Sequence, residues 1–388
     1  MDEIVIIAGE ESGDRYGAEL ATQLMHWNNT LVLSGIGGQH MQAAGVKLVS
    51  DLARFGVTGI SEIISHLWVI KKAFTAIKKH LITSKPRLLI LIDYPGFNLR
   101  LAKFAKKALG LHIIYYISPQ IWAWKANRLE TIRQYVDHMA VILPFEKNIY
   151  QKAGVPVSFV GHPLIQNIPW DTYDEARASA VRYRFNLSAH QSLVALLPGS
   201  RTNELKQHLP VMLEAAKRLH QKRPDTHFII PVAKNLSLGA LKPYLQDKTI
   251  ANLPLTIVQE DTLEIVNAAD CVAVASGTAS LECALLSKPM CIVYKATYLT
   301  YIAATKLIKV KYLGLCNLLS GRMIVPELLQ YDCNPHELAL SLEALLYNKA
   351  FARQMTRHLS AIKSSLSPAQ SDGSLLNLIK NQLQIATS

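Results

Sequence analysis

Three loops of this sequence combine small, hydroxyl and charged residues directly after an apolar run. The segment 274–282, Val-Ala-Ser-Gly-Thr-Ala-Ser-Leu-Glu, is typical of a strand end, a tight turn at Ser276, Gly277 and Thr278, and a helix start. Free backbone N–H groups and the positive end of the helix dipole favour a phosphate at such a turn. Glu282 could reach back to hydroxyls of a nucleotide sugar. The alternative is that Ser276 or Thr278 is only a helix N-cap.

The loop 197–201, Leu-Pro-Gly-Ser-Arg, ends a second apolar run. Gly199 and Ser200 would let a ligand approach the backbone, and Arg201 supplies a planar cation that suits a diphosphate. That arginine could neutralise a leaving UDP. Since the sequence has no His/Cys or Asp-x-Asp metal constellation, we expect no metal and no cofactor. A surface arginine near a helix start is the alternative, and it is less favourable because a cation opposes the helix dipole there.

Asp93 follows the strongly apolar run Leu88–Ile92. It is therefore expected at the carboxyl end of a strand, where the catalytic loops of parallel sheets lie. A carboxylate in that place can take a proton from an attacking hydroxyl, which is the general-base role that a sugar acceptor needs. The alternative is an Asp that only forms a turn ahead of Pro95.

Two further loops are candidates for binding a sugar acceptor. In the first, 9–14, Glu10 and its neighbour Glu11 would repel a pyrophosphate at a helix start, so hydroxyl groups are the better ligands. Ser12 or Asp14 could instead be an N-cap. In the second, 118–125, Trp122 could stack on a sugar or an acyl chain, or could simply cover a hydrophobic edge.

The elements that must position these loops alternate along the chain. Short apolar runs at 4–8, 31–33, 88–92, 113–117, 139–142 and 157–160 are separated mostly by amphipathic helical patterns. The alternation breaks at the Pro-containing stretch 161–171 and resumes with runs at 193–197, 228–231, 255–258, 271–274 and 290–293. Buried strands that alternate with helices predict parallel, doubly wound α/β sheets.

The sequence therefore predicts an α/β protein of two Rossmann-like domains that face a cleft, the GT-B architecture of many nucleotide-sugar glycosyltransferases. We expect an N-terminal acceptor and membrane-facing domain at 1–165 and a C-terminal donor domain at 172–345. A helical tail at 346–388 would pack back on the N-terminal domain or on a partner chain, so a homodimer is one alternative.

The chain has 388 residues, of which 50% are hydrophobic and 18% charged, a composition that excludes a disordered protein. Its net charge of +12 is concentrated at 54–107, where eleven Lys or Arg accompany two acids. Such a patch favours an anionic partner: nucleic acid, an anionic lipid surface or a phosphorylated substrate.

The pattern at 61–82 predicts a long amphipathic helix within this basic stretch. Its core stripe consists of Ile63, Leu67, Ile70, Phe74, Ile77 and Leu81. Ile64 and Trp68 fall on another face, which also carries Lys71 and Lys72. Apolar groups mixed with lysines suit a helix that dips into an anionic membrane, and the alternative is a solvated lysine face.

The five cysteines lack a C-x-x-C pattern and are expected to be buried thiols in a reducing compartment. Asp2 and Glu3 precede only a short apolar run, which is not typical of a signal peptide, and no apolar run approaches the length of a bilayer span. We therefore expect a cytoplasmic protein that touches a membrane from that side.

Eight motifs in order resemble those of the lipid-A-disaccharide synthases, and the resemblance runs nearly end to end. They are Gly9-Glu-x-Ser-Gly-Asp14, Ile92-Asp-x-Pro-x-Phe-Asn98, Ser118-Pro-x-x-Trp-Ala-Trp124, Leu143-Pro-Phe-Glu146, Gly161-His-Pro163, Leu197-Pro-Gly-Ser-Arg201, Ala275-Ser-Gly-Thr-Ala279 with Glu282, and Asn317-Leu-Leu-x-Gly-Arg322. Each motif alone is weak, whereas the ordered set is specific.

The resemblance implies an inverting glycosyltransferase of lipid A biosynthesis on the cytoplasmic face of the inner membrane. It would join UDP-2,3-diacylglucosamine to 2,3-diacylglucosamine 1-phosphate (lipid X), giving the β-1,6-linked disaccharide 1-phosphate and UDP. Asp93 would be the base, and Glu10, Ser12, Asp14, Asn98 and Trp122 would line the acceptor side. The UDP side would comprise Gly199, Ser200, Arg201, Ser276, Gly277, Thr278, Glu282, Asn317 and Gln330.

One position departs from the family pattern. Many members have a second Asp after the Pro of the Asp93 loop, where this chain has Gly96. If that second carboxylate carried the chemistry, this chain would be impaired, so we assign the base to Asp93.

Two other classes of function fit part of the sequence. Another GT-B enzyme acting on UDP-N-acetylglucosamine would share the architecture, but a peptidoglycan N-acetylglucosaminyltransferase has a Gly-rich first loop where this chain has 9–14. A UDP-N-acetylglucosamine 2-epimerase has no use for the Ile64 and Trp68 face. A basic nucleic-acid-binding α/β protein would explain the charge, but no recognised binding module is present, and we expect no nucleic-acid partner.

Overall fold

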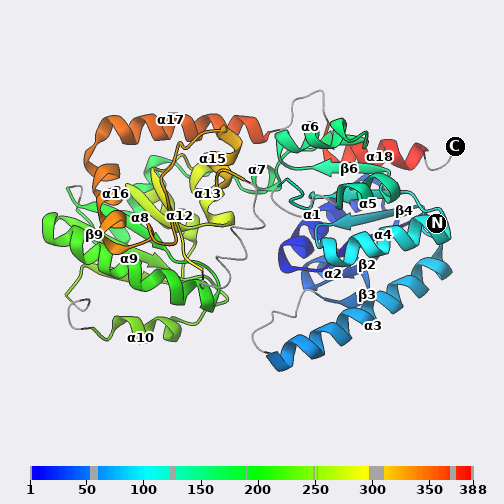
Figure 1. Ribbon diagram of the computed structural model, residues 1–388, viewed down its shortest axis with the longest axis horizontal. Coiled ribbons are helices and arrows are strands. Elements are labelled where there is room, and N and C mark those ends of the chain that lie inside the picture. Colours follow the sequence, from blue (N-terminus) through cyan, green and yellow to red (C-terminus); the bar gives the residue numbers. More distant parts are fainter. Residues whose placement is uncertain are drawn as a thin grey trace. The chain divides into compact units, whose positions relative to one another are not determined.

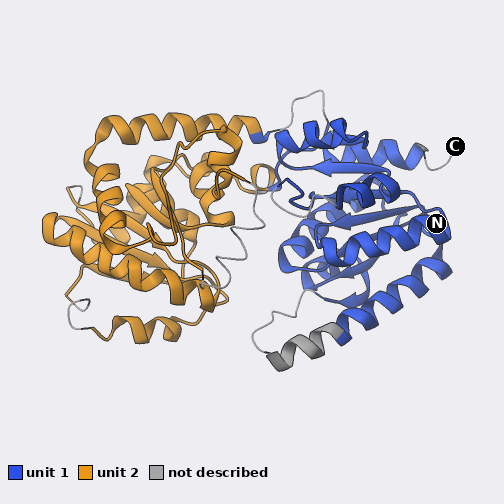
Figure 2. Ribbon diagram, in the orientation of Figure 1, with its two compact units in different colours: residues 1–163, 366–388 blue, residues 164–365 orange. Residues whose placement is uncertain are grey.

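The computed structural model describes residues 2–52, 60–122, 128–188, 190–247, 250, 252–296, 310–367 and 373–385, and for 60–67, 167 and 385 it describes the backbone alone (Figure 1). The chain divides into two compact units (Figure 2). Unit 1 comprises Met1–Pro163 and Leu366–Ser388, and unit 2 comprises Leu164–Ser365.

Unit 1 is built on a seven-stranded parallel sheet in the order β3-β2-β1-β4-β5-β6-β7. The strands are β1 (Glu3–Ala8), β2 (Val32–Gly37), β3 (Lys47–Asp51), β4 (Leu88–Ile92), β5 (Ile113–Tyr116), β6 (His138–Val141) and β7 (Val157–Phe159). Its helices are α1 (Glu11–Trp27), α2 (Gln39–Ala43), α3 (Ile60–Ser84), α4 (Pro95–Leu109), α5 (Arg128–Tyr135), α6 (Pro144–Lys152) and α18 (Leu375–Ile385).

Both faces of this sheet are covered, which is why its central strands are apolar throughout. Successive side chains of a strand point to opposite faces. Val5 and Ile7 accordingly pack with residues of α3, α4, α5 and α6, whereas Ile4 and Ile6 pack with residues of α1, α2 and α18. The apolar runs of the sequence are therefore strands buried on both sides.

Unit 2 has a six-stranded parallel sheet in the order β10-β9-β8-β11-β12-β13. The strands are β8 (Ser192–Leu197), β9 (Thr226–Pro231), β10 (Leu255–Val258), β11 (Cys271–Ala275), β12 (Met290–Tyr294) and β13 (Glu327–Leu329). The helices are α7 (Pro163–Asn167), α8 (Glu175–Arg184), α9 (Thr202–Lys222), α10 (Lys242–Leu245), α12 (Thr262–Ala268), α13 (Thr278–Leu285), α15 (Leu315–Ser320), α16 (Pro335–Tyr347) and α17 (Lys349–Leu366), with short 3-10 turns η1 (Trp170–Thr172) and η2 (Leu238–Leu241).

The predicted parallel α/β fold with two sheets is confirmed. Two edge strands, β3 and β13, were not predicted from the sequence. The helical tail predicted at 346–388 divides between the units: α17 lies almost entirely in unit 2, whereas α18 packs in unit 1. Leu375, Leu378 and Ile379 of α18 belong to the core beside β1, so this end of the chain completes the first domain.

The order of strands reverses at one place in each sheet. In unit 1 the reversal lies between β1 and β4, and in unit 2 it lies between β8 and β11. The loops that leave these strands run to helices on opposite faces, which opens a crevice at the carboxyl ends of the strands, where doubly wound proteins bind ligands. The loops after β1, β4, β8 and β11 were all selected for chemistry from the sequence, together with the loop 118–125 after β5.

The five cysteines are reduced and buried, as predicted, and burial raises the pKa of each thiol. Within the described ranges, no helix combines the length and apolar character that a bilayer span requires.

Candidate functional site

The loop after β4 holds Asp93 in an unusual backbone conformation. Asp93 and Tyr94 both have positive φ angles, 44° and 46°. Such conformations cost non-glycine residues about 1–3 kcal/mol each and persist only where the surroundings over-determine them. Here Asn98 Nδ2 donates to the carbonyls of Ile92 and Asp93 at 3.1 and 2.7 Å, and the Tyr115 hydroxyl donates to the Asp93 carbonyl at 2.6 Å. The turn is therefore rigidly held at the strand end.

The carboxyl group of Asp93 is half-buried, and its pKa is raised to about 6. Burial is the main cause, and the charge of Glu10 adds to it, while a backbone hydrogen bond from Tyr94 and the charge of Arg128 act in the opposite direction. A general base works best when its pKa lies near the operating pH. Asp93 has that property.

Gly9 lets the loop after β1 approach the loop after β4. A Cβ atom on Gly9 would lie 2.1 Å from Cδ1 of the Tyr94 ring, so any other residue here would push the two loops apart. The Tyr94 ring in turn stacks on Phe97 of α4 with its centroid at 5.9 Å. This close approach brings exposed Glu10 near enough to Asp93 to shift its pKa.

Asp14 and Asn98 were predicted to line the acceptor side, but the structure uses both for support. Asp14 is 1% exposed, and its carboxylate accepts hydrogen bonds from the backbone N–H groups of Gly38, His40 and Met41 at 2.6, 3.0 and 3.1 Å. It therefore caps α2. Asn98 is fully buried and stabilises the Asp93 turn. Ser12 is exposed on the first turn of α1.

Trp122 is held by a carboxyl group that the sequence analysis did not select. Its Nε1 donates to Glu146 Oε1 at 3.0 Å, and its ring meets the Phe145 ring edge-on at 5.3 Å between centroids. Glu146 is 2% exposed, and burial raises its pKa to about 7. Next to it, Ser118 Oγ lies 2.7 Å from the Tyr150 hydroxyl. Trp124 lies outside the described residues.

In unit 2, the loop 198–201 joins β8 to α9. Gly199 has a φ of +121°, and Arg201 is the N-cap of α9 with a side chain that is 79% exposed. Glu204 Oε2 accepts from the backbone N–H groups of Ser200 and Arg201 at 2.9 and 3.3 Å. Gly199 and Ser200 were predicted to let a ligand approach the backbone here, and in the structure a side chain of the same helix binds these two N–H groups.

His208 ties the same loop to the end of β12. It is buried, and burial lowers its pKa, so the ring is neutral. Lys295 N donates to Nε2 at 3.0 Å, which leaves Nδ1 as the donor to the Pro198 carbonyl at 2.8 Å. These bonds fix the tautomer and hold the ends of β8 and β12 together.

The turn after β11 has the geometry that the sequence predicted. Ser276 N donates to the Val293 carbonyl at 3.0 Å, and α13 begins at Thr278 with no side-chain cap. Gly277 and Thr278 are exposed, while Ser276 and Glu282 are half-buried. The start of α13 is therefore exposed at the carboxyl end of the sheet, and the first N–H groups of a helix have no partner within it.

Asn317 and Gln330, which the family resemblance assigned to UDP, are both engaged within the protein. Asn317 is fully buried; its Nδ2 donates to Val325 O and Glu327 Oε1, and its Oδ1 accepts from Ile324 N and Val325 N, all within 2.9 Å. Gln330 pairs through its side-chain amide with both backbone groups of Ala296, each at 3.0 Å. Their side chains position the loops after α15 and β13.

The long amphipathic helix predicted at 61–82 is present as α3. Ile77 and Leu81 are buried as expected, and Trp68 is 71% exposed together with Lys71 and Lys72. The side chain of Ile64 lies outside what the structure describes.

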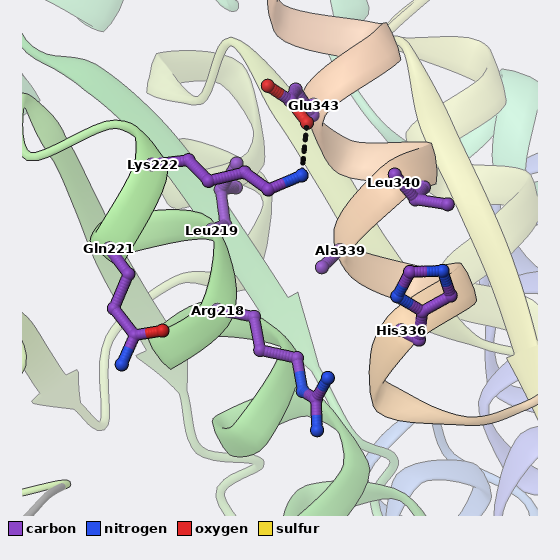
Figure 3. Close-up of a pocket in the computed structure, with 8 residues that line it drawn as sticks. All are labelled: Arg218, Leu219, Gln221, Lys222, His336, Ala339, Leu340 and Glu343. Carbon is purple, nitrogen blue, oxygen red and sulfur yellow. Dashed lines mark hydrogen bonds and ion pairs between the residues drawn. The ribbon is translucent and has the colours of Figure 1, made fainter.

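Two surface cavities of unit 2 are lined by other residues. One, of about 210 Å³, lies between α9 and α16, where Lys222 Nζ is 3.3 Å from Glu343 Oε2 (Figure 3). The other, of about 470 Å³, is lined by Arg182, Asp270 and Lys288 near the amino ends of β8 and β11. In the part of the chain that the structure describes, no three His, Cys, Asp or Glu side chains form a metal-binding group.

The family model described as lipid-A-disaccharide synthetase matches residues 4–375. The lipid-A-disaccharide synthase 1 of Legionella pneumophila (strain Lens) is 52% identical over 380 residues, which cover 98% of this chain and 97% of that protein. The lipid-A-disaccharide synthase of Geobacter sulfurreducens is 41% identical over 364 residues, with 94% and 92% covered.

Solved structures share the fold at low sequence identity. A putative UDP-N-acetylglucosamine 2-epimerase from Listeria monocytogenes matches with a TM-score of 0.62 at 13% identity, covering 98% of this chain and 95% of that one. MurG of Acinetobacter baumannii matches with a TM-score of 0.58 at 13% identity, covering 99% and 100%. These likenesses confirm the GT-B architecture.

Proposed function

Because the chain belongs to the lipid-A-disaccharide synthase family of hexosyltransferases, we propose that it joins UDP-2,3-diacylglucosamine to 2,3-diacylglucosamine 1-phosphate. In this reaction the 6-hydroxyl oxygen of the acceptor attacks C1 of the donor sugar. The C1–oxygen bond to UDP breaks, UDP leaves with the bonding electron pair, and the hydroxyl proton passes to a base. The product is the β-1,6-linked disaccharide 1-phosphate.

The base in this proposal is Asp93, and its environment is the observation that carries the assignment. The carboxyl group stands at the switch point of the first sheet, in a turn fixed by Asn98 and Tyr115, with a pKa of about 6. At neutral pH it is ionised, yet its conjugate acid is weak enough to hold an accepted proton near that pH. Gly96, where many relatives have an acid, is exposed, and a Cβ there would meet no atom within 4 Å. The Asp93 turn therefore does not depend on a side chain at position 96.

The donor diphosphate would bind at the switch point of the second sheet. There, the exposed N–H groups at the start of α13 and the guanidinium of Arg201 supply positive charge, and Glu282 would accept from the ribose hydroxyls. Groups fixed in advance where charge develops stabilise a leaving group without reorganisation.

The lipid substrates require access to a membrane. We assign that contact to α3, where exposed Trp68 adjoins Lys71 and Lys72. An aromatic ring beside lysines suits the interface of an anionic bilayer, here the cytoplasmic face of the inner membrane. The same basic stretch would attract the 1-phosphate of the acceptor.

A product assay with the two diacylglucosamine substrates, run with and without a chelator, tests the proposal. We expect disaccharide and UDP in equal amounts in both conditions. The Asp93→Ala variant should lose turnover and keep UDP binding, because the donor groups belong to unit 2. Near-normal transfer by that variant would remove Asp93 from the base role, and absence of the disaccharide with the wild-type chain would refute the function.

A further inference from the structure

Glu204 occupies the place beside the 198–201 loop where an anion would otherwise bind. Its Oε2 accepts from Ser200 N at 2.9 Å and from Arg201 N at 3.3 Å, while its Oε1 accepts from Arg201 Nη1 at 3.1 Å. A carboxylate at a helix start interacts favourably with free N–H groups and with the helix dipole. The N–H groups of Ser200 and Arg201 are thus already satisfied from within the chain.

Gly199 shows that this arrangement is built into the loop. A Cβ atom on Gly199 would lie 2.4 Å from Glu204 Oε2 and 2.6 Å from Glu204 Cβ, and the φ of +121° favours glycine in any case. The glycine therefore makes room for the carboxylate of Glu204, whereas it was predicted from the sequence to let a ligand approach the backbone.

Two further bonds hold the loop from other directions. Asn235 Nδ2 donates to the Ser200 carbonyl at 2.9 Å, and His208 Nδ1 donates to the Pro198 carbonyl at 2.8 Å. With the backbone fixed by these contacts, the exposed guanidinium of Arg201 is the part of the loop that remains free to turn. Its bond to Glu204 restricts that movement.

We infer that Glu204 is a positioning residue for the donor diphosphate. It accepts hydrogen bonds from the N–H groups of Ser200 and Arg201, and it holds the Arg201 guanidinium in place. The inference rests on the proposed function. The guanidinium has five N–H donors, and the bond to Glu204 uses one of them, so the others can meet a diphosphate. The loop then binds the donor through its arginine side chain, and the backbone N–H contribution comes from the start of α13, because Ser276 N already donates to the Val293 carbonyl.

The negative charge of Glu204 also acts against binding of a diphosphate. It would repel a diphosphate and partly neutralise Arg201. The repulsion is partly weakened by solvent, because the Glu204 side chain is 28% exposed and salt screens charges that reach solvent. Fixing a long, mobile side chain in advance lowers the entropy lost when the ligand binds. Positioning therefore outweighs repulsion.

A double-mutant cycle on the full chain tests this role, with UDP affinity measured by calorimetry. Glu204→Gln keeps an oxygen for the two N–H groups of the loop but removes the negative partner of Arg201. We expect it to weaken UDP binding about tenfold, as a contacting charged pair allows, and to raise the donor KM more than it lowers kcat. In an Arg201→Met background the same change should have no further effect.

The control variant is Glu214→Gln, which neutralises another acid of α9 that pairs with Lys217 and Arg218. It should leave UDP binding and transfer unchanged. Thermal unfolding of Glu204→Gln should stay close to that of the wild type, since the helix cap is retained.

Two results would overturn the inference. Unchanged or tighter UDP binding by Glu204→Gln, alongside a clear loss in Arg201→Met, would mean that Glu204 does not position the arginine, while the donor site itself stands. Independent effects of the two substitutions in the double variant would mean that Glu204 acts by another route. A wild-type chain that binds no UDP would overturn both this inference and the proposed function.

Discussion

Replacing Asp93 by Asn should inactivate the enzyme and at the same time stabilise unit 1. The pKa of Asp93 is raised from 3.8 to about 6, chiefly by burial. A carboxyl group that binds its proton more tightly in the folded state than in the unfolded state favours folding only while it is protonated. Stability is therefore lost as the pH rises from about 4 to about 6, and above that range the folded protein carries the full cost of the buried charge.

The size of this cost follows from the shift. One pKa unit corresponds to about 1.4 kcal/mol, so a shift of about two units makes the ionised group cost at most about 3 kcal/mol. Asparagine has nearly the same shape and no charge, so it avoids this cost. The difference in unfolding free energy between Asp93→Asn and wild type should be about a third of that limit at pH 4.5 and approach the limit at pH 7.5.

Urea unfolding followed by tryptophan fluorescence at a series of pH values would measure this difference. Four of the five tryptophans, Trp27, Trp68, Trp122 and Trp124, belong to unit 1, so the signal reports mainly on the unit that contains Asp93. Glu11→Gln, which neutralises an exposed acid of α1, is the matched control and should change stability by less than about 0.5 kcal/mol at every pH.

The outcome that would refute this reasoning is a constant difference between Asp93→Asn and wild type across the pH range. It would mean that the carboxyl group has the same proton affinity in the folded and unfolded chain. In the active enzyme, the same pKa predicts that kcat/KM falls below about pH 6, because only the ionised base accepts the acceptor's proton. A kcat/KM that stays constant below about pH 6 would mean that Asp93 does not accept the proton.

Three further predictions concern the surroundings of the site. Gly9→Ala should destabilise unit 1 by about 1–3 kcal/mol and lower kcat, because the added Cβ would overlap the Tyr94 ring. Gly96→Ala is the control and should do neither, because a Cβ there meets open space. Equal effects of the two substitutions in urea unfolding and transfer assays would contradict this. Glu146→Gln should gain stability relative to wild type as the pH rises from 5 to 8, because the buried acid has a pKa of about 7 and Gln still accepts from Trp122. Thermal unfolding at both pH values measures this gain. A difference that does not change with pH would mean that ionisation of Glu146 does not destabilise the protein. Trp68→Ser should reduce co-sedimentation of the protein with anionic vesicles. The control Tyr183→Ser, which replaces an exposed aromatic residue of unit 2, should leave co-sedimentation unchanged. Equal vesicle binding by the two variants would exclude α3 as the membrane contact.

The sheets and the placement of the loops could be predicted because they depend on local patterns. A strand buried on both faces must be apolar at every position, as β4 is, and such a run is visible without any knowledge of its neighbours. Edge strands lack this signal. β3, Lys-Leu-Val-Ser-Asp, contains charged and hydroxyl residues, and β13 has only three residues, so neither could be recognised from its composition.

The roles of single polar residues could not be predicted in the same way. Asp14 and Asn317 lie in motifs that suggest ligand contacts, yet their partners are backbone groups of residues 38–41 and 324–325. A buried polar side chain must be hydrogen-bonded, but whether the partner is a ligand or a distant turn depends on the folded backbone. Glu146 and Glu204 were missed for the same reason, because an acid three residues into a helix is usually only a cap.

The two switch points differ in charge, and under the proposed function this difference would separate the substrates. The crevice of unit 1 carries the carboxyl groups of Glu10 and Asp93, whose mutual repulsion is part of the raised pKa of Asp93. The crevice of unit 2 carries the N–H groups at the start of α13 and the guanidinium of Arg201. A diphosphate placed against two carboxylates would be repelled, and a general base placed beside a guanidinium would lose its raised pKa. If both substrates bind to one chain, as proposed, the donor therefore belongs to unit 2 and the attacking hydroxyl to unit 1, and an exchange of these roles would disable both.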